Sequence, residues 1–410
     1  MNPARVIRVG LATSRTFMRN GALMLAGMSA LFLSSDTSGA LSTSNAGSER
    51  WHGTGALIVK WARNDRAPIS RAGLMLVAPS AGRKRNLVPD RWTVRAWRAN
   101  GPVLVARKNA PNRSLAILHR GRAKPVPRSS GARCAAISGD GTKATFITGE
   151  LDAALWVVHT GKPNRVQRVD HGIFGMEQCP IWYSRSGRFA YTVDRGGMRE
   201  VKVWNAGAVK MIARFAAPDV SRFATFDWSP DASELVFARD FNLYRYRSGV
   251  VARVGPEGVL RPLAPRPPEP VPWVNVRYSP SGELLAVSSP SQTGVFRRDG
   301  SLVRTFDGPF NGWAGNAGVL VLGFDADRVA RLVLHPLDDG EPLSLVRRFK
   351  LGVISDPRGR WFSYVEWPNH LIFRRPDGSL LRRIHFASFV PAVFGAVSET
   401  GRLYSPVSVL

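Results

Sequence analysis

A short motif recurs along the 410-residue chain and constrains its fold more than any other feature of the sequence. Each copy has an apolar stretch that often ends in an aromatic residue, then serine, a tight turn, glycine and a second apolar stretch. The sharp copies are CAAISGDG at 134–141, IWYSRSG at 181–187, FDWSPDA at 226–232 and VRYSPSG at 276–282. With the looser copies, the motif closes at positions 55, 101, 141, 187, 232, 282, 318, 359 and 401, about 43 residues apart on average.

The intervals between the motifs contain further strand-like runs, such as ALWVV at 154–158 and NLYRY at 242–246. Four short strands in a repeat of this length are typical of a β-propeller blade. We therefore predict that residues 51–410 form one all-β propeller of four-stranded antiparallel blades, with eight blades favoured and seven as the alternative. The last motif lacks a third strand before Leu410, so we expect the C-terminal strands to close the ring by pairing with the first blade.

The residue types of the motif suit a turn between two strands. Serine, proline and aspartate favour tight turns, and glycine tolerates a positive φ. The segment from Trp228 through Ser229, Pro230 and Asp231 to Ala232, followed by LVF and NLY, resembles the WD40-like PD40 repeat of TolB-type propellers. The sequence departs from that family at Ala232, where glycine is usual. We also expect that the α/β domain that precedes the propeller in TolB is absent here, because residues 1–50 leave no room for it.

The N-terminal segment has the pattern of a secretory signal. Residues 1–20 contain four arginines and no acidic residue, an apolar run covers 21–33, and the small residues Ser38 and Ala40 follow. We therefore interpret 1–40 as a signal peptide, with an uncleaved anchor as the alternative, and 41–50 as a flexible lead-in. This predicts an exported protein that is periplasmic, extracellular or on the cell surface.

The sequence lacks the short motifs of the common catalytic and metal sites. It has no G-x-S-x-G nucleophile elbow, no Walker A motif, no H-E-x-x-H and no EF-hand loop. The seven histidines do not have the spacing of metal ligands. We therefore predict a protein that is not an enzyme and has no cofactor, no metal and no catalytic residue. A propeller enzyme that acts on a glycan or peptide at the channel mouth is the alternative.

The two cysteines occupy nearly equivalent places in consecutive repeats. Cys134 precedes Gly141 by seven residues, and Cys179 precedes Gly187 by eight. Innermost strands of neighbouring blades converge toward the axis, and an exported protein favours oxidised cysteines. We therefore predict a disulfide between Cys134 and Cys179, with two free thiols as the alternative.

The formal net charge of +27 is concentrated near the N-terminal end of the expected propeller. Residues 60–133 hold 18 of the basic residues and only two acidic ones, Asp65 and Asp90. Such a sector attracts anionic partners. An arginine-rich composition without a ligand is the other explanation. The candidate anion-binding residues are Arg83, Lys84, Arg85, Arg91, Arg95, Arg98, Arg107 and Lys108.

The sequence therefore predicts an exported, non-enzymatic propeller that serves as a scaffold for a protein partner or an anionic cell-envelope component. A polyanion-binding envelope protein is a further alternative. Nucleic acid is not expected as a partner, because the protein is expected to be exported. We expect membrane contact only through the N-terminal segment or through electrostatics. The oligomeric state does not follow from the sequence.

Overall fold

In the computed structural model the described residues form strands, turns and loops, and within some strands only the backbone is described. The described residues are 55–61, 71–77, 79, 84–88, 92–97, 103–107, 114–119, 122–138, 140–149, 153–172, 181–183, 187–216, 223–239, 242–248, 250–253, 275–325, 329–347, 349–356, 358–366, 369–386, 390–397 and 403–404.

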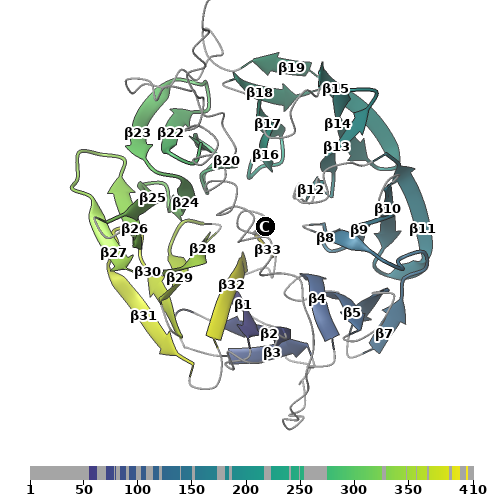
Figure 1. The fold of residues 1–410 in the computed structure, drawn as a ribbon, viewed down its shortest axis with the longest axis horizontal. Coiled ribbons are helices and arrows are strands. Elements are labelled where there is room, and N and C mark those ends of the chain that lie inside the picture. Colours follow the sequence, from purple (N-terminus) through teal and green to yellow (C-terminus); the bar gives the residue numbers. More distant parts are fainter. Residues whose placement is uncertain are drawn as a thin grey trace, which may run out of the picture.

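The described strands form sheets that follow one another around a central axis (Figure 1). The first sheet has five strands, β3 (Lys84–Val88), β2 (Arg71–Val77), β1 (Gly55–Trp61), β32 (Val390–Val397) and β33 (Leu403–Tyr404). The second sheet has β4 (Trp92–Trp97), β5 (Val103–Arg107), β6 (Leu115–His119) and β7 (Arg122–Pro125). The third has β8 (Arg133–Ile137), β9 (Lys143–Thr148), β10 (Ala154–His159) and β11 (Lys162–Asp170). The fourth has β12 (Ile181–Tyr183), β13 (Phe189–Arg195), β14 (Met198–Asn205) and β15 (Ala208–Ala216).

The next four sheets repeat this arrangement. The fifth has β16 (Phe223–Trp228), β17 (Glu234–Arg239), β18 (Asn242–Arg247) and β19 (Val250–Arg253). The sixth has β20 (Asn275–Tyr278), β21 (Leu284–Ser288), β22 (Gln292–Arg297) and β23 (Leu302–Asp307). The seventh has β24 (Phe310–Ala314), β25 (Gly318–Phe324), β26 (Ala330–Pro336) and β27 (Leu343–Arg347). The eighth has β28 (Phe349–Ser355), β29 (Phe362–Glu366), β30 (His370–Arg374) and β31 (Leu380–His385).

Within the sheets, consecutive strands pair antiparallel, as in β20 with β21 and β21 with β22. The first strand of each four-stranded sheet lies nearest the axis and the last lies at the rim (Figure 1). The predicted all-β propeller of four-stranded antiparallel blades is therefore confirmed.

The ring closes through pairing between opposite ends of the chain. β1 pairs antiparallel with β32, from Gly55 opposite Val397 to Trp61 opposite Val390. Figure 1 shows the yellow β32 beside the purple β1. The hydrophobic core continues across the closure, because Val77 of β2 packs in one cluster with Trp361 and residues of β30 and β31. The prediction that C-terminal strands close the ring is confirmed.

The core lies between neighbouring sheets rather than in the middle of the ring. Between the fourth and fifth sheets, for example, Val201 and Val203 pack with Phe226, Leu235 and Phe237. The middle strands are covered on both faces, so their sequences are apolar almost throughout, as in LLAVS of β21. The outermost strand β7, with the sequence RAKP, instead faces solvent, and all four of its residues are exposed.

The recurrent serine motif forms the turn between the first and second strands of a sheet. In the fifth sheet the Ala232 amide donates to the Ser229 carbonyl at 2.7 Å, and the Glu234 amide donates to Ser229 Oγ at 3.0 Å. Gly282 adopts a φ of 83° at the equivalent position of the sixth sheet. Ala232 replaces glycine yet adopts the same left-handed conformation, with a φ of 60°. The turn geometry therefore persists where the sequence departs from the family pattern.

These turns also contact one another from sheet to sheet. A Cβ atom on Gly282 would lie only 2.9 Å from Cδ of Pro230 in the preceding turn. The Ser281 amide donates to Oδ1 of Asn316 in the following turn at 3.0 Å. Small residues in the turns therefore allow neighbouring blades to approach closely on this side of the ring.

We expect Gly282→Ala to lower the free energy of unfolding by about 1–2 kcal/mol, because alanine is strained at a positive φ. The clash with Pro230 adds to this cost. Gly161→Ala is the control, since nothing lies within 4 Å of its Cβ position. Urea denaturation of both variants measures the difference. Equal stability of the two variants would contradict the proposed role of Gly282.

Candidate functional site

The predicted anion-binding residues fall partly on described strands. Lys84 and Arg85 lie on β3 at the rim, Arg95 lies on the innermost strand β4, and Arg107 lies on β5. Only the backbone is described at these four positions. Arg83, Arg91, Arg98 and Lys108 lie outside the described residues. Anion binding by this set stays a prediction.

The predicted disulfide also falls partly outside the described residues. Cys134 lies on β8, where its backbone is described, and Cys179 lies outside the described residues. The bond between them stays a prediction.

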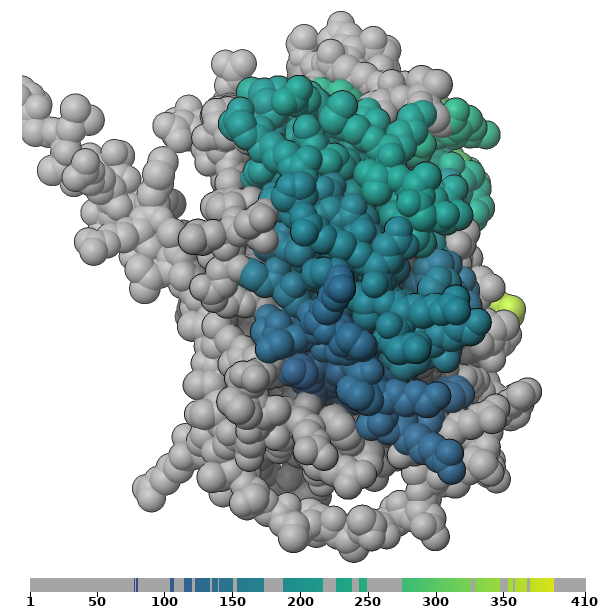
Figure 2. All heavy atoms as spheres, turned by 90° about the vertical axis from the view of Figure 1, so that its right-hand side faces the viewer, coloured from purple at the N-terminus to yellow at the C-terminus, as the bar shows by residue number. Residues whose placement is uncertain are grey.

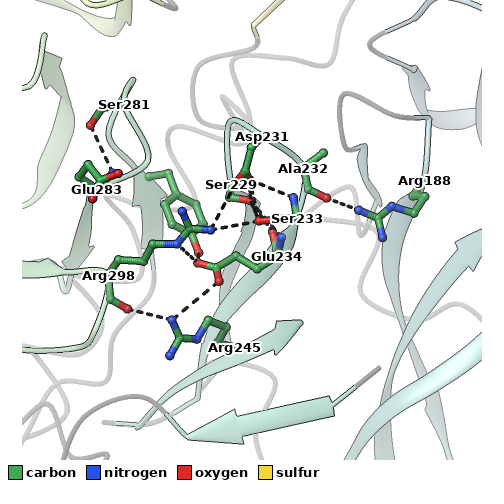
Figure 3. Close-up of polar contacts among 11 residues, drawn as sticks. Arg188, Ser229, Asp231, Ala232, Ser233, Glu234, Arg245, Ser281, Glu283 and Arg298 are labelled. Atoms are coloured by element: carbon green, nitrogen blue, oxygen red, sulfur yellow. Dashed lines mark hydrogen bonds and ion pairs between the residues drawn. The ribbon is translucent and has the colours of Figure 1, made fainter. Parts of the chain in front are cut away.

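A buried carboxylate lies at the centre of a polar cluster between the fifth and sixth sheets (Figure 3). We call Asp231, Ser233, Glu234, Arg245, Tyr278 and Arg298 the Glu234 cluster. Glu234 is 0% exposed, and its Oε1 accepts hydrogen bonds from the Tyr278 hydroxyl and, at 2.9 Å, from Arg298 Nε. Arg245 Nη1 lies 3.7 Å from Oε2 of Glu234. The cluster thus joins β17 and β18 to the β20 strand and the β22–β23 turn.

The charges of the cluster influence one another. Burial raises the pKa of the Tyr278 hydroxyl, and its hydrogen bond to Glu234 raises it further. Burial raises the pKa of Asp231, but hydrogen bonds from Ser229 and Ser233 and the charge of Arg298 outweigh this and place it below its ordinary value. Asp231 therefore stays ionised opposite Arg298, whose Nη2 lies 3.5 Å from it.

The arrangement suits a clamp between blades better than a reaction centre. Two arginines and a phenol surround Glu234 and hold its carboxylate away from solvent. On the other side of the same turn, Arg188 Nη2 donates to the Ala232 carbonyl, and its guanidinium lies 4.8 Å from the Trp228 ring centroid. Arginines from two neighbouring sheets therefore hold this turn in place.

A second buried network links the third and fourth sheets. The side chain of Asp170, at the end of β11, is 9% exposed. Its oxygens accept hydrogen bonds from Tyr191 at 3.0 Å, Arg195 at 2.6 Å and Lys202 at 2.9 Å. Burial raises the pKa of Asp170, but hydrogen bonds from Lys202, the His171 amide and Tyr191, together with the charge of Lys202, outweigh it and lower the pKa below its ordinary value.

Exposed basic side chains gather on the rim of the second and third sheets, where β7 and β11 are neighbours. We call Arg122, Lys124, Lys162, Arg165 and Arg168 the basic rim; all five residues are exposed. The single carboxylate in these two strands is that of Asp170, whose side chain is 9% exposed and paired with Arg195 and Lys202. Figure 2 shows the described residues on this side of the ring as one continuous surface. The rim therefore presents positive charge to solvent without an exposed carboxylate on β7 or β11.

An open cavity of about 450 Å³ lies beside the basic rim, at the turn between β10 and β11. Lys162 and Arg165 of the basic rim line it, together with Thr142, His159, Thr160 and Gly161. The hydroxyls of Thr142 and Thr160 already donate to Asp140 and to the Gly141 carbonyl. The side-chain donors left for a ligand are therefore the two cations and the ring of His159.

Sequence reasoning did not identify most of these residues. Lys162, Arg165 and Arg168 are spaced along one strand, and only the ring places them beside Arg122 and Lys124. Arg298 lies in a polar segment, RRDGS at 297–301, that looks like an ordinary surface turn. No sequence signal pairs it with Glu234, which lies 64 residues earlier.

We expect Glu234→Gln to lower the free energy of unfolding by about 3 kcal/mol, because the neutral amide leaves Arg245 and Arg298 without their buried counter-charge. Glu283→Gln is the matched control, since Glu283 follows the equivalent turn of the next sheet and is exposed. Its effect should stay within about 0.5 kcal/mol. Similar losses in both variants, measured by urea denaturation, would refute the clamp.

The lowered pKa of Asp170 predicts a dependence of stability on pH. A carboxyl whose folded pKa lies below its unfolded value of about 4 adds stability above pH 4, and this is lost as the pH falls through the folded pKa. Wild type should therefore exceed Asp170→Asn in stability at about pH 7, and the gap should shrink by about pH 3. A gap that is the same at both pH values would show that Asp170 does not ionise as described.

Two further findings concern metal sites and membrane spans. In the part of the chain that the structure describes, no three His, Cys, Asp or Glu side chains are grouped so that they could hold a metal ion. Among the same residues, no helix has the length and apolarity needed to cross a membrane.

Comparison with known proteins supports the fold. No family model matches the sequence, and no curated protein matches it. Dihydro-heme d1 dehydrogenase NirN in complex with DHE is similar in structure, with a TM-score of 0.51, 13% identity, and coverage of 83% of this chain and 75% of that one. TolB from Acinetobacter baumannii matches with a TM-score of 0.38, 13% identity, and coverage of 82% and 65%. A 6-phosphogluconolactonase-like protein from Bacteroides uniformis matches with a TM-score of 0.43, 12% identity, and coverage of 84% and 99%.

These similarities correct one prediction. The absence of catalytic motifs led us to predict a protein that is not an enzyme, and this is wrong as an inference from the sequence. The propeller structures that this chain resembles include NirN, a dehydrogenase. A propeller can assemble a site from loops that are distant in sequence, so a lack of short motifs does not exclude catalysis. In fold, the chain is a β-propeller that resembles TolB and other propeller proteins of known structure.

Proposed function

We propose that this protein is an exported propeller that binds an acidic partner protein on its basic rim. Export rests on the N-terminal sequence, in which a basic segment, an apolar run and small residues follow one another. Partner binding rests on the single observation that β7 and β11 expose five cationic side chains and no carboxylate.

The distribution of acidic residues strengthens this proposal. The carboxylates of Asp170, Glu200 and Glu234 are at most 12% exposed, and each lies within 4 Å of a cation. These three carboxylates are therefore paired within the protein and do not compensate the exposed cations of the basic rim. Cations on neighbouring strands attract an acidic surface and speed its approach.

The cavity at the turn between β10 and β11 gives the rim a recess in addition to its charge. Lys162 and Arg165 line it, so a glutamate or aspartate of the partner could enter and pair with either cation. A recess of this kind favours a shaped partner over a flexible polyanion, because it fixes where one carboxylate is bound.

The test is photo-crosslinking from the rim. A benzophenone amino acid replaces Gln167, which is exposed on β11 beside Arg168, and the variant is illuminated in an envelope fraction. We expect an acidic protein to crosslink to the variant that carries benzophenone at position 167 and keeps the native cations of the basic rim. The yield should fall severalfold in the triple variant Lys124→Glu, Arg165→Glu, Arg168→Glu, because the charge of the rim is reversed.

The control reverses the same number of charges elsewhere. Arg247, Arg297 and Arg375 are exposed at turns of the fifth, sixth and eighth sheets, and their replacement by glutamate should leave the yield unchanged. Equal losses in both triple variants would mean that net charge alone drives capture. Crosslinks only to lipid or to wall polymer would replace the acidic protein with an anionic envelope component.

A further inference from the structure

Two histidines face each other on the outer half of the eighth sheet. β30 and β31 are its two outermost strands (Figure 1). His370 begins β30, His385 ends β31, and the strand register places these residues directly opposite each other. Their ring centroids lie 4.9 Å apart, with an angle of 46° between the ring planes. The two residues are distant in sequence, so only the pairing of the strands brings their imidazoles together.

The backbone fixes how the two rings are presented. The Phe386 amide donates to the Asn369 carbonyl at 3.1 Å, and Asn369 Nδ2 donates to the Phe386 carbonyl at 2.9 Å. Hydrogen-bonded and non-hydrogen-bonded pairs alternate along an antiparallel ladder. His370 and His385 therefore form a non-hydrogen-bonded pair, the kind in which opposite side chains lie closest and on the same face.

The nitrogen atoms of the pair are not used by the protein. Nδ1 of His370 is buried and has no hydrogen-bond partner among the described residues. His385 is exposed. A buried polar atom without a partner is unfavourable, whichever tautomer the ring adopts. An ion bound at this nitrogen would engage it.

The nearest charges leave room for a cation. Glu366 lies opposite His370 on the inner side, on β29. Its Oε2 is 2.9 Å from Nη2 of Arg383, which is two residues before His385. The carboxylate thus offsets the guanidinium, whose positive charge would otherwise oppose a metal ion beside the imidazoles.

Imidazole nitrogens are favoured ligands of Zn²⁺ and Cu²⁺. A Zn–N bond is about 2.0–2.1 Å long, so two nitrogens on one ion lie no more than about 4 Å apart. Rings whose centroids are 4.9 Å apart can reach this separation by rotating their side chains. Water would fill the other coordination positions, which is consistent with the lack of a third protein ligand among the described residues.

We propose that His370 and His385 together bind one divalent transition metal ion, Zn²⁺ or Cu²⁺, at the outer end of the β30–β31 pair. The ion joins the last two strands of the sheet that meets the first sheet at the ring closure. Ile384 and Phe386, the neighbours of His385, pack there in one cluster with Val77. The bound ion therefore stabilises the closed ring.

Calorimetric titration of the full protein with zinc chloride tests the site. Removing either ligand, in His370→Ala or His385→Ala, should weaken Zn²⁺ binding at least about tenfold, the loss typical even for an outer-sphere partner of a metal ligand. His119→Ala is the matched control, because His119 is also exposed on a strand end but lies opposite Arg122. It should bind Zn²⁺ as wild type does.

Two further measurements locate the ion. Electron paramagnetic resonance with Cu²⁺ should show two nitrogen ligands in wild type and one in each single variant. Zn²⁺ should raise the melting temperature of wild type and of His119→Ala, but not that of the other two variants, because only the folded hairpin holds both ligands together.

Circular dichroism without metal shows whether each variant is folded. His385 is exposed, so His385→Ala alone tests the proposal if His370→Ala does not fold. Unchanged Zn²⁺ binding in a folded variant of either histidine would overturn the proposal, and so would a Cu²⁺ spectrum of wild type with fewer than two nitrogen ligands. The site lies on the eighth sheet and the basic rim on the second and third, so neither proposal depends on the other.

Discussion

The antiparallel pairing of β1 with β32 is the constraint on which the rest of the structure depends. It supplies the first sheet with its inner strand and allows Val77 to be buried against the eighth sheet. The pairing joins residues 55–61 to residues 390–397 and so closes a loop of more than 300 residues. Closing this loop costs conformational entropy, which the hydrophobic core between the sheets must offset. Each core cluster among the described residues lies between two neighbouring sheets, so an open ring would expose both halves of one such interface.

Closure also determines what each strand shows to solvent. Inner and middle strands are covered by their neighbours, and buried carboxylates such as Asp170 and Glu234 take their counter-charges from adjacent sheets. The outermost strands are accessible to other molecules. They differ in character: β7 and β11 present cations, while β31 carries His385 opposite His370. The proposed binding sites therefore follow from where the ring ends each sheet, rather than from a catalytic motif.

Much of the fold could be predicted from the sequence because the turns are local. Ser229, Pro230 and Asp231 form their turn with neighbours in the chain, and the motif marks each passage between first and second strands. The Glu234 cluster and the basic rim, in contrast, depend on contacts between residues that are far apart in the sequence. Glu234 meets Arg298 only because consecutive sheets pack together, and β11 lies beside β7 for the same reason. The lack of motifs also misled us about catalysis, since short motifs are not needed where loops from several blades can assemble a site.

Hydrogen exchange of the intact protein tests the ring closure most directly. Peptides that cover β1 and β32 should exchange as slowly as those of the buried strand β21, and they should lose protection together as denaturant is added. Rapid exchange in β32 while β1 and the buried strands of the other sheets stay protected would contradict a ring closed by this pair.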